Sequence, residues 1–589
     1  MHQLCADRRT GTVRFFAGVR GAKVQLSLAA LAVAFAAADT YVVVLALPSM
    51  MATVGVSLDQ VQRGAPIVSA FLLGYVAILP LIGRISDLRG RRPVLVASLV
   101  IFSFGSLVTA LSSHLGVLVA GRFLQGVGAG GLVPATLALV ADLYPVERRS
   151  VPLGVVSAVQ EIGSVIGPLF GAIILAVSDW ETIFWVNLGV GLVLAVALRA
   201  TGEGPRNSAR PWPDFLGGAL TVLAVAGLVL TLKQPPSLVD DVVLGWPFVP
   251  LTGTSIWMAP LTLASLGFAL LALLRFVFAK RPLIDVRGWT RSAVRADLIG
   301  ALILGVALAG VIFAFAAADP EKSNLSGNTG WWLGGSAIAF VCFMIWMRTA
   351  KDPLIPRGAL GRRPAWASLL ANFFIGSALI ASLVEIPTFA RFTQYPDSQL
   401  GASMVLLRLL VAIPIGAVLG GMLTKRLSTG TVTAFAMAAV AVANVMFSRW
   451  DAHSLASVWV TLPLLLGGFG FGLALAPLNS ALLAATDAAV HGLASAFAVV
   501  TRMIGMLVGV SVLTEIGLHH FYSASAHVTP DKVCPPGVID CPAYIDQIQG
   551  AMIGQMSSIF TGAAVCALIA GLIALIGSTH TSPLHSRTA

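Results

Sequence analysis

The sequence predicts an all-α polytopic membrane protein, and three observations support that class. Hydrophobic residues make up 57% of the 589-residue chain and charged residues only 11%, whereas about a quarter of the residues in a soluble domain are charged. The apolar residues form runs of roughly 18 to 28, long enough for membrane-spanning helices and unlike the alternating ~10-residue strands of a membrane barrel. The net charge of +11 comes from basic residues in short loops between these runs, which indicates topology and not a nucleic-acid partner.

Sixteen hydrophobic segments follow one another along the chain. They lie at 25–48, 64–85, 93–111, 115–141, 151–177, 183–200, 215–232, 258–279, 296–318, 331–348, 365–391, 400–424, 430–448, 456–484, 492–518 and 551–577. The first segment has no small-residue cleavage site after it, so we expect a retained span and not a signal peptide. An even count places both termini on the same side of the membrane.

The loops indicate which side of the membrane is cytoplasmic. On the side of the N-terminus the loops carry the basic stretches SDLRGRR, ERRS, RNSAR, KRPLIDVRGWTRSAVR, RTAKDPLIPRGALGRR and TKR. The opposite loops hold single basic residues such as Arg63 and Lys322. The positive-inside rule then predicts that both termini are cytoplasmic and that the protein lies in the cytoplasmic membrane. Fourteen spans are the alternative, if two of the segments do not cross.

Four central segments separate two groups of six. The stretches KRPLI at Lys280 and KDPLI at Lys351 each follow a helical hairpin, 71 residues apart, which indicates an inserted or duplicated two-helix unit. We expect the following parts: a basic cytoplasmic N-terminus at 1–24, a six-helix bundle at 25–200, a linker at 201–214, extra membrane helices at 215–348, a linker at 349–364, a second six-helix bundle at 365–577 and a cytoplasmic tail at 578–589.

The last loop of the second bundle, at 519–550, is predicted to be extracytoplasmic and contains Cys534 and Cys541. Because an oxidising compartment favours disulfides, we expect these two cysteines to pair, with free thiols as the alternative.

The first half of the chain contains DTYVVVLALP, GRISDLRGRR, GRFLQGVGAG and GSVIGPLFGA in that order, which resembles the order of motifs in the major facilitator superfamily. GRISDLRGRR (83–92) resembles its cytoplasmic loop motif, and GRFLQGVGAG (121–130) resembles the arginine-bearing motif of proton-coupled members. GSVIGPLFGA (163–172) resembles the antiporter motif of drug exporters, and DTYVVVLALP (39–48) the first-span motif of the fourteen-helix drug:proton antiporter branch. The chain also resembles the lipid-exporting mycobacterial members of that branch in four stretches: DTYVVV (39–44), LLGYVAILPLIGRISD (72–87), QEIGSVIGPLFG (160–171) and LLRLLVAIPIGAVLGG (406–421). The resemblance implies a major facilitator fold of two six-helix bundles, here with four extra central helices.

The sequence departs from the family pattern in two places. The basic residue that usually follows the loop aspartate is Leu88 here, with Arg89 one place later. The usual D-x-T of the first span begins at Asp39 but continues with Thr40 and Tyr41. Neither departure removes an acidic group.

Glu161 stands at the head of a glycine-rich apolar run that must cross the membrane. An ionised carboxylate costs at least ~2.5 kcal/mol at mid-membrane, so we expect a functional residue with a basic partner. Because the fifth span of this superfamily packs against the second span of the other half, we propose Arg408 as that partner. The alternatives are a static ion pair and a water-lined Glu161 without this partner.

Three further residues are candidates for proton or substrate coupling. Asp39 lies roughly 21 Å into its segment at 1.5 Å per residue, beyond mid-membrane, and its alternative is a solvated helix end. Arg122 and Gln125 share a helix face, and the permanent charge of Arg122 can hold a nearby carboxylate ionised. The alternative for Arg122 is bonding to backbone.

Conformational gating is expected at two motifs. The resemblance implies that Asp87 faces the start of the fifteenth segment near HGLASAF, a contact that favours the outward-facing state; the alternative is a plain basic anchor. The other gating candidates are Gly83, Gly90, Arg91 and Arg92 of the loop motif, and Gly163, Gly167, Pro168 and Gly171, which allow close approach and a bend or serve only packing.

Two additional charged candidates lie in the second half. Arg502 is placed to contact a carboxylate or a lipid headgroup. Glu385 lies near the outer end of the eleventh segment, and its alternative is an acid that is only exposed to water.

Together these features predict a proton-coupled exporter that moves a lipid or another hydrophobic or amphiphilic compound out of the cytoplasmic membrane by alternating access. The proton gradient supplies the energy, so we expect no cofactor and no metal. The expected partners are the substrate, protons, membrane lipids and a periplasmic lipid-carrying lipoprotein, with the chain as a monomer. The alternatives are a multidrug:proton efflux pump and a non-transporting membrane sensor or scaffold. No H-E-x-x-H, P-loop or G-x-S-x-G motif occurs, so an enzyme is not expected.

Overall fold

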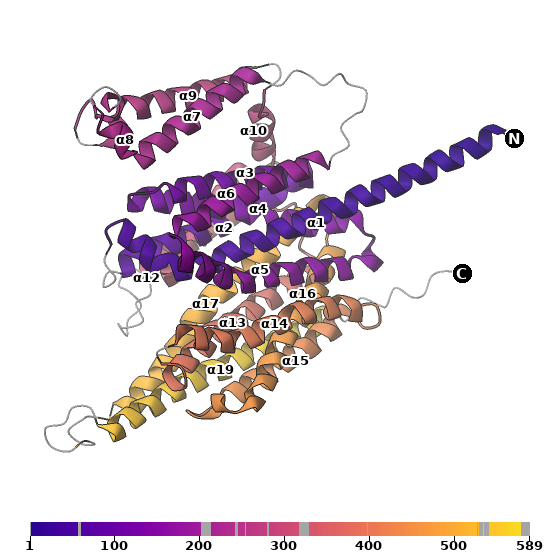
Figure 1. Ribbon diagram of the computed structural model, residues 1–589. Coiled ribbons are helices and arrows are strands. Elements are labelled where there is room, and N and C mark those ends of the chain that lie inside the picture. The colour runs from indigo at the N-terminus through magenta and orange to yellow at the C-terminus, as the bar shows by residue number, and fades with distance from the viewer. Residues whose placement is uncertain are drawn as a thin grey trace.

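The computed structural model is helical throughout its regular structure (Figure 1). It describes residues 2–56, 61–201, 214–241, 245–253, 255–279, 282–316, 329–396, 398–526, 528, 534 and 541–578. Each of the sixteen predicted segments coincides with a helix. Within the described residues, fourteen helices are long and apolar enough to cross a membrane, or up to fifteen if a bent pair is one span. The all-α polytopic class is therefore confirmed, while the count of sixteen spans stays a prediction.

The first six long helices pack on one another. They are α1 (His2–Thr53), α2 (Val61–Arg89), α3 (Arg91–Ala110), α4 (Leu115–Leu143), α5 (Ser150–Val177) and α6 (Glu181–Ala200). Helix α4 packs against α2 and α3, α1 against α5, and α3 against α6. These segments form helices because the lipid interior offers no hydrogen-bond partner to a backbone N–H or C=O group, and a helix pairs these groups within itself. Gly90, with a φ of 95°, turns the chain sharply between α2 and α3.

The last six long helices form a second bundle. They are α13 (Arg363–Thr393), α14 (Gln399–Leu423), α15 (Thr429–Phe447), α16 (Thr461–Ala484), α17 (His491–Ser525) and α19 (Pro542–Ser578). Helix α16 packs against α14 and α15, and α19 against α13, α15 and α17. Across the seam between the bundles, α5 packs against α14 and α16, and α17 packs against α2 and α4.

Among the described residues, the two bundles share an apolar core at one end of the molecule. We call the end where α2 meets α3 the motif end, and the opposite end the far end. At the motif end, Leu493 and Ala496 of α17 are buried in one cluster with Leu79 and Ile85 of α2. In Figure 1 the second bundle slopes away from the first toward the lower left, so the bundles diverge from this contact.

Toward the far end each bundle has a core of its own. In the first bundle, Val43 and Phe184 belong to a cluster that includes no residue of the second bundle. In the second bundle, Phe389 and Phe447 belong to a cluster without residues of the first. The described apolar packing therefore joins the bundles near the motif end and leaves them separate near the far end.

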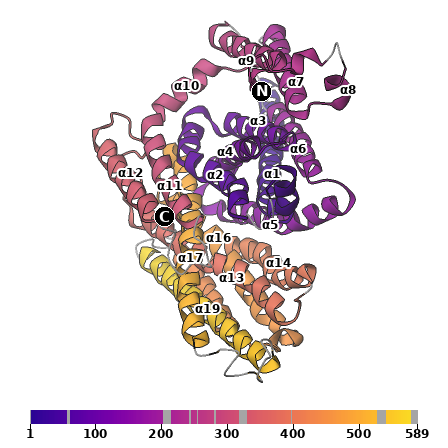
Figure 2. The same ribbon diagram turned by 90° about the vertical axis from the view of Figure 1, so that its left-hand side faces the viewer.

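Four long helices and two short ones lie between the bundles in sequence. They are α7 (Phe215–Lys233), α8 (Pro236–Val239), α9 (Pro260–Phe278), α10 (Val286–Arg295), α11 (Leu298–Ala316) and α12 (Thr329–Thr349). Helices α7 and α9 form one hairpin, which packs on the first bundle where Leu232 meets Leu107 and Leu188. Helices α11 and α12 form the other, and α11 packs on both α2 and α17. Figure 2 shows α10 passing between the two hairpins.

In each of the two hairpins, an aspartate caps the first helix and also binds groups at the end of the second helix. Asp214 caps α7 by accepting a hydrogen bond from Gly217 N (3.0 Å), and it also accepts from Arg275 Nε (3.2 Å). The backbone of Leu283 also stabilises this carboxylate electrostatically. These hydrogen bonds, that of Gly217 first, lower the pKa of Asp214.

Asp297 repeats this arrangement in the second hairpin. It caps α11 through Gly300 N (2.9 Å) and accepts from Trp346 Nε1 (2.9 Å) and from Leu354 N (2.9 Å). Leu283 and Leu354 are the leucines of KRPLI and KDPLI, so the sequence repeat has a structural counterpart in two closed helical hairpins.

Two expected boundaries differ in the structure. Helix α1 begins at His2, so the basic stretch expected as a separate N-terminus at 1–24 continues the first span as helix. Helices α17 and α19 extend into the loop expected at 519–550, to Ser525 and from Pro542. The linker at 201–214 and the tail at 578–589 lie almost wholly outside the described residues.

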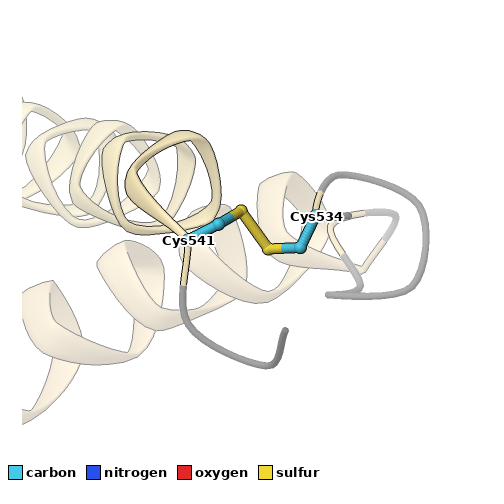
Figure 3. Close-up of a disulfide and its surroundings, with 2 residues drawn as sticks. All are labelled: Cys534 and Cys541. Atoms are coloured by element: carbon cyan, nitrogen blue, oxygen red, sulfur yellow. A yellow bond between two sulfur atoms is a disulfide. The ribbon is translucent and has the colours of Figure 1, made fainter. Parts of the chain in front are cut away.

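The loop between α17 and α19 contains a disulfide between Cys534 and Cys541, whose Cα atoms are 5.6 Å apart (Figure 3). The expected pairing of these two cysteines is confirmed.

Replacing Asp297 with alanine is expected to destabilise the second hairpin. The change leaves the buried N–H of Leu354 and the partly buried Nε1–H of Trp346 without their acceptor, which costs about 3 kcal/mol. We expect the melting temperature of the purified full-length protein in detergent to fall by several degrees. Asp352→Ala, an exposed aspartate of KDPLI, is the matched control and should leave it unchanged. An equal fall in both variants would refute the role of Asp297.

Candidate functional site

A buried ion pair lies inside the first bundle. Arg122 Nη1 of α4 is 2.9 Å from Asp39 Oδ2 of α1, and the two side chains are 1% and 0% exposed. The amide of Asn187 in α6 donates to the other carboxylate oxygen of Asp39. Three helices of one bundle are thus tied together by a single carboxylate. Arg122 was expected to lie beside a carboxylate and keep it ionised, and the carboxylate beside it is that of Asp39.

The arginine of this pair is satisfied on its other sides. Arg122 Nη1 donates to Gln125 Oε1 (2.8 Å), and Gln125 Nε2 donates in turn to Ser106 Oγ of α3 (2.8 Å). The guanidinium lies 4.5 Å from the ring centre of Phe71, a distance at which a cation is attracted to a ring face. The network therefore holds both charges in fixed positions deep in the bundle.

Glu161 lies at a different place, in a small cavity on the seam between the bundles. The cavity has a volume of about 10 Å³, which is room for about one water molecule. Its lining combines polar and apolar residues of five helices: Val133, Leu137, Ser157, Gln160, Glu161, Asn372, Asn479, Ala498, Val499 and Arg502. Glu161 comes from the first bundle and Arg502 from the second, so two opposite charges face one cavity from the two halves of the molecule.

Both charges lie about three helical turns from the start of their helices. Arg502 is ten residues after Gly492, close to the start of α17, and Glu161 is eleven residues after Ser150, the start of α5. Both helices start at the motif end, so each charge lies roughly 15 Å from that end at 1.5 Å per residue. This depth falls near the centre of a ~30 Å hydrocarbon layer.

The expected contact between Glu161 and Arg408 is not formed in this structure. Helices α5 and α14 do pack together, since Gly154 lies against Ala417. The guanidinium of Arg408, however, donates to Thr461 Oγ1 at the start of α16 (3.2 Å), within its own bundle. The cation whose charge acts on Glu161 is Arg502. Arg502 was expected to contact either a carboxylate or a lipid headgroup, and in this structure it faces the carboxylate of Glu161.

Asp87 occupies the N-terminus of α17, as the loop motif indicated. Its carboxylate accepts hydrogen bonds from the backbone N–H groups of Gly492 (2.8 Å) and Leu493 (3.1 Å). The positive end of a helix stabilises such an anion by ~0.3–1 kcal/mol. The expected contact is therefore confirmed, and it joins the first bundle to the second at the motif end.

Arg91 holds this aspartate in place. It donates to Asp87 and also pairs with Asp142 of α4 through Nε (3.0 Å). Close backbone packing accompanies these bonds, because a Cβ at Gly83 would lie 2.6 Å from the carbonyl oxygen of Gly492. The glycine at position 83 is thus required for the contact of α2 with α17.

A second contact closes the motif end on the other side of the seam. Ser150 Oγ at the start of α5 is 3.1 Å from Ser480 Oγ of α16. Ser150 also lies against Gly421 of α14. In addition, Arg84 Nη1 donates to the carbonyl of Ala489 just before α17 (3.1 Å). The bundles are therefore joined at the motif end by hydrogen bonds on both flanks.

The glycine motif of α5 packs on α1. A Cβ at Gly163 or Gly167 would collide with the carbonyl oxygens of Ala34 or Ala38, and Gly171 lies against Val42. The side chain of Pro168 lies outside the described part of α5. This motif thus brings two helices of one bundle into backbone contact.

Two other candidates are placed away from the cavity. Glu385 is buried in α13, 6% exposed, and does not belong to the described lining of the cavity. Arg92 donates to the carbonyl of Arg199 at the end of α6 (3.3 Å), which ties α3 to α6.

Several polar residues of the site were missed in the sequence. Asn187 joins the ion pair, and Asn372 and Asn479 line the cavity. Each is a lone amide in an apolar segment, and a polar residue at membrane depth is a functional signal by itself. That signal was available for amides as well as for charges.

Comparisons with known proteins agree with this architecture. Residues 29–355 match the model of the Major Facilitator Superfamily. The triacylglyceride transporter of Mycobacteroides abscessus is 33% identical over 536 residues, which cover 89% of this chain and 88% of that protein. The triacylglyceride transporter of Mycobacterium tuberculosis is 32% identical over 573 residues, or 94% of each chain.

Solved structures are similar in fold. The human organic anion transporter MFSD10 aligns with a TM-score of 0.50 and 16% identity, over 94% of this chain and 99% of that one. The proton:xylose symporter XylE aligns with a TM-score of 0.51 and 13% identity, over 94% of this chain and 95% of that one. The two-bundle fold that was expected is thereby confirmed.

Asp39→Asn should destabilise the protein strongly. The change keeps the shape of the side chain but leaves the Arg122 charge buried without a counter-charge, which typically costs about 3–5 kcal/mol. Thermal unfolding of the full-length protein in detergent measures the loss. The double variant Asp39→Asn/Arg122→Gln should lose less than the two single variants combined.

Asp142→Asn serves as the control, because Asp142 pairs with Arg91 but is 43% exposed. It should lower the stability by about 1 kcal/mol or less. Purely additive losses in the Asp39 and Arg122 variants would contradict the buried pair.

Proposed function

The chain belongs to the major facilitator superfamily, and on that basis we propose that it exports a lipid from the cytoplasmic membrane in exchange for protons. It is a multi-pass membrane transporter related to triacylglyceride transporters. The direction of transport, the coupling to protons and the cytoplasmic position of both termini belong to the proposal.

The conformation supports alternating access. The bundles are joined at the motif end by Asp87 and Ser150, whereas their cores are separate toward the far end. The basic loop motif at residues 83–92 assigns the motif end to the cytoplasm by the positive-inside rule. On this orientation, we assign the conformation to a state closed at the cytoplasmic end, and its opening toward the outside is part of the proposal.

The observation that carries the coupling proposal is the pair of opposite charges on the seam. Glu161 and Arg502 face one water-sized cavity from opposite bundles. Protonation of Glu161 removes its attraction to Arg502, so the free energy of bundle contact changes with the proton. The Asp39–Arg122 pair lies within one bundle, so its protonation does not by itself part the bundles. Of the two expected acids, Glu161 is therefore better placed to couple proton binding to rocking.

The energy of one proton is adequate for this task. With a pH difference of about one unit and a membrane potential of about 100 mV, one proton supplies about 3.7 kcal/mol. That amount moves a two-state equilibrium from about 1:20 to about 20:1. No nucleotide is required for the cycle.

The substrate class follows from the relatives. Proteins that are 32–33% identical over nearly the whole chain are named triacylglyceride transporters. We therefore place a triacylglyceride-like lipid first, and small lipophilic drugs second. Helices α17 and α19, at 35 and 37 residues, are longer than the ~20 residues that span a bilayer. Their far ends thus reach beyond the membrane, where a periplasmic lipid-carrying lipoprotein could receive the cargo.

Glu161→Gln is expected to uncouple transport from the proton gradient. In proteoliposomes with an imposed pH gradient, labelled triglyceride should move at a gradient-dependent rate with the wild-type protein. With the glutamine variant the gradient should change the rate less than about twofold, because no proton can be bound at the seam. A lipophilic dye, offered in parallel, tests the drug alternative.

Glu385→Gln is the matched control, since Glu385 is a buried acid of the same length outside the cavity. Its variant should keep the response to the gradient. Gradient-driven transport at the normal rate in the Glu161→Gln variant would remove the coupling proposal.

The double variant Ser150→Cys/Ser480→Cys tests alternating access. Because the two hydroxyl oxygens are 3.1 Å apart, the introduced thiols can form a disulfide that locks the motif end. Oxidation should then reduce transport at least tenfold, and reduction should restore it. The single variants and the reduced wild-type protein control for Cys534–Cys541. Full transport by the oxidised double variant would exclude opening at this end.

A further inference from the structure

The short helix α10 lies close to the plane of the membrane. It meets the apolar helix α11 at a bend of 72°. If α11 runs along the membrane normal, α10 must run nearly parallel to the surface at the motif end. Asp297, at a φ of 62°, makes this turn possible and is fixed there by its three hydrogen bonds.

The two faces of α10 differ in chemistry. Trp289 and Ala293 pack against the apolar core that joins the bundles. Arg287, Arg291 and Arg295 are exposed, and their spacing of four residues places them on one face of the helix. A short in-plane helix with an apolar inner face and an arginine row is typical of a membrane-surface helix.

Helix α10 is also bonded to the loop motif. Arg89, at the end of α2, is 2.7 Å from Asp285 Oδ2, and its guanidinium lies 4.6 Å from the ring centre of Trp289. Asp285 caps α10 by accepting from Gly288 N (2.9 Å). The hydrogen bond from Arg89, followed by that from Gly288, lowers the pKa of Asp285. Arg89 is two residues after Asp87, so α10 and the contact with α17 are adjacent on α2.

We propose that Arg287, Arg291 and Arg295 bind the headgroups of anionic phospholipids in the cytoplasmic leaflet, and that this binding stabilises the closed motif end. The charge complementarity is direct, because anionic headgroups are the negative groups at the depth where α10 lies. Binding holds α10 against the surface, and through Asp285 and Trp289 it holds Arg89 and the end of α2. The bound lipid is a regulator at the cytoplasmic face and not the cargo.

The strength of the effect can be stated. Each arginine near an anionic membrane surface strengthens attraction about 5-fold, so three give roughly 100-fold. The face carries no described acidic residue other than Asp285, which is occupied by Arg89. If these arginines only set the membrane topology, basic residues would be expected here, but the bonds that join α10 to the loop motif would not be needed.

Lipid binding is tested with the full-length protein in nanodiscs, with fluorescent phosphatidylglycerol and phosphatidylcholine as probes. The wild-type protein should enrich phosphatidylglycerol over phosphatidylcholine. Arg287→Gln/Arg291→Gln/Arg295→Gln should reduce the enrichment at least tenfold. The matched control Arg348→Gln/Lys425→Gln/Arg426→Gln removes three exposed cations near the same membrane face and should reduce it less than twofold. Equal losses in the two triple variants, or no loss in the first, would overturn the proposal.

The link to the motif end is tested in the Ser150→Cys/Ser480→Cys background. Phosphatidylglycerol should raise the rate of disulfide formation severalfold, and the triple arginine variant should lose this effect. Asp285→Asn should keep the lipid enrichment but lose the effect on the rate, because it breaks the tie to Arg89. A rate that does not depend on the lipid in the wild-type background would refute the regulatory step. Neither readout needs transport, so failure here is distinct from failure of the export proposal.

Discussion

A charge at bilayer depth needs a partner, and this constraint decides where the polar groups of the molecule lie. The loss of one partner of a buried pair costs about 3–5 kcal/mol, which is a large part of the stability of a protein. Asp39 and Arg122 meet it within one bundle and therefore stiffen that bundle. Glu161 and Arg502 face one cavity from opposite sides of the seam, where their electrostatic attraction depends on how the bundles are arranged. The need to pair buried charges thus makes the Asp39–Arg122 pair a rigid link within one bundle, whereas it makes the interaction of Glu161 with Arg502 depend on the conformation.

The sequence was sufficient for much of the fold, because hydrophobic length and basic loops report directly on membrane helices. It also located Asp87 against the start of α17, since the loop motif is short and its partner follows from the resemblance. It did not identify the partner of Glu161. Arg408 and Arg502 are both arginines in apolar segments, and which one faces the seam depends on side-chain direction and helix packing that segment depth alone does not give. The amides Asn187 and Asn372 were missed because, unlike Gln125, they do not lie beside a charged residue of a recognised motif.

The two hairpins of central helices pack on the bundles in different ways. Asp214 and Asp297 close two hairpins in the same way, yet the hairpins occupy different positions. The first packs on α3 and α6 of one bundle and can move with it as a unit. The second contacts α2 and α17 and therefore touches both moving parts. The two copies of one unit therefore differ in their contacts: the first packs on one bundle and the second packs on both.

The position of α11 makes the two flanks of the seam unequal. On the α2–α17 flank, a molecule diffusing sideways in the lipid meets α11 before it reaches the junction, since this helix packs on both. On the α5–α14 flank, no central helix packs over the junction within the described part of the chain. The described central helices therefore cover one lateral flank of the seam and leave the other flank without such a cover, so under the proposed function the two routes by which a lipid reaches the seam from the bilayer differ.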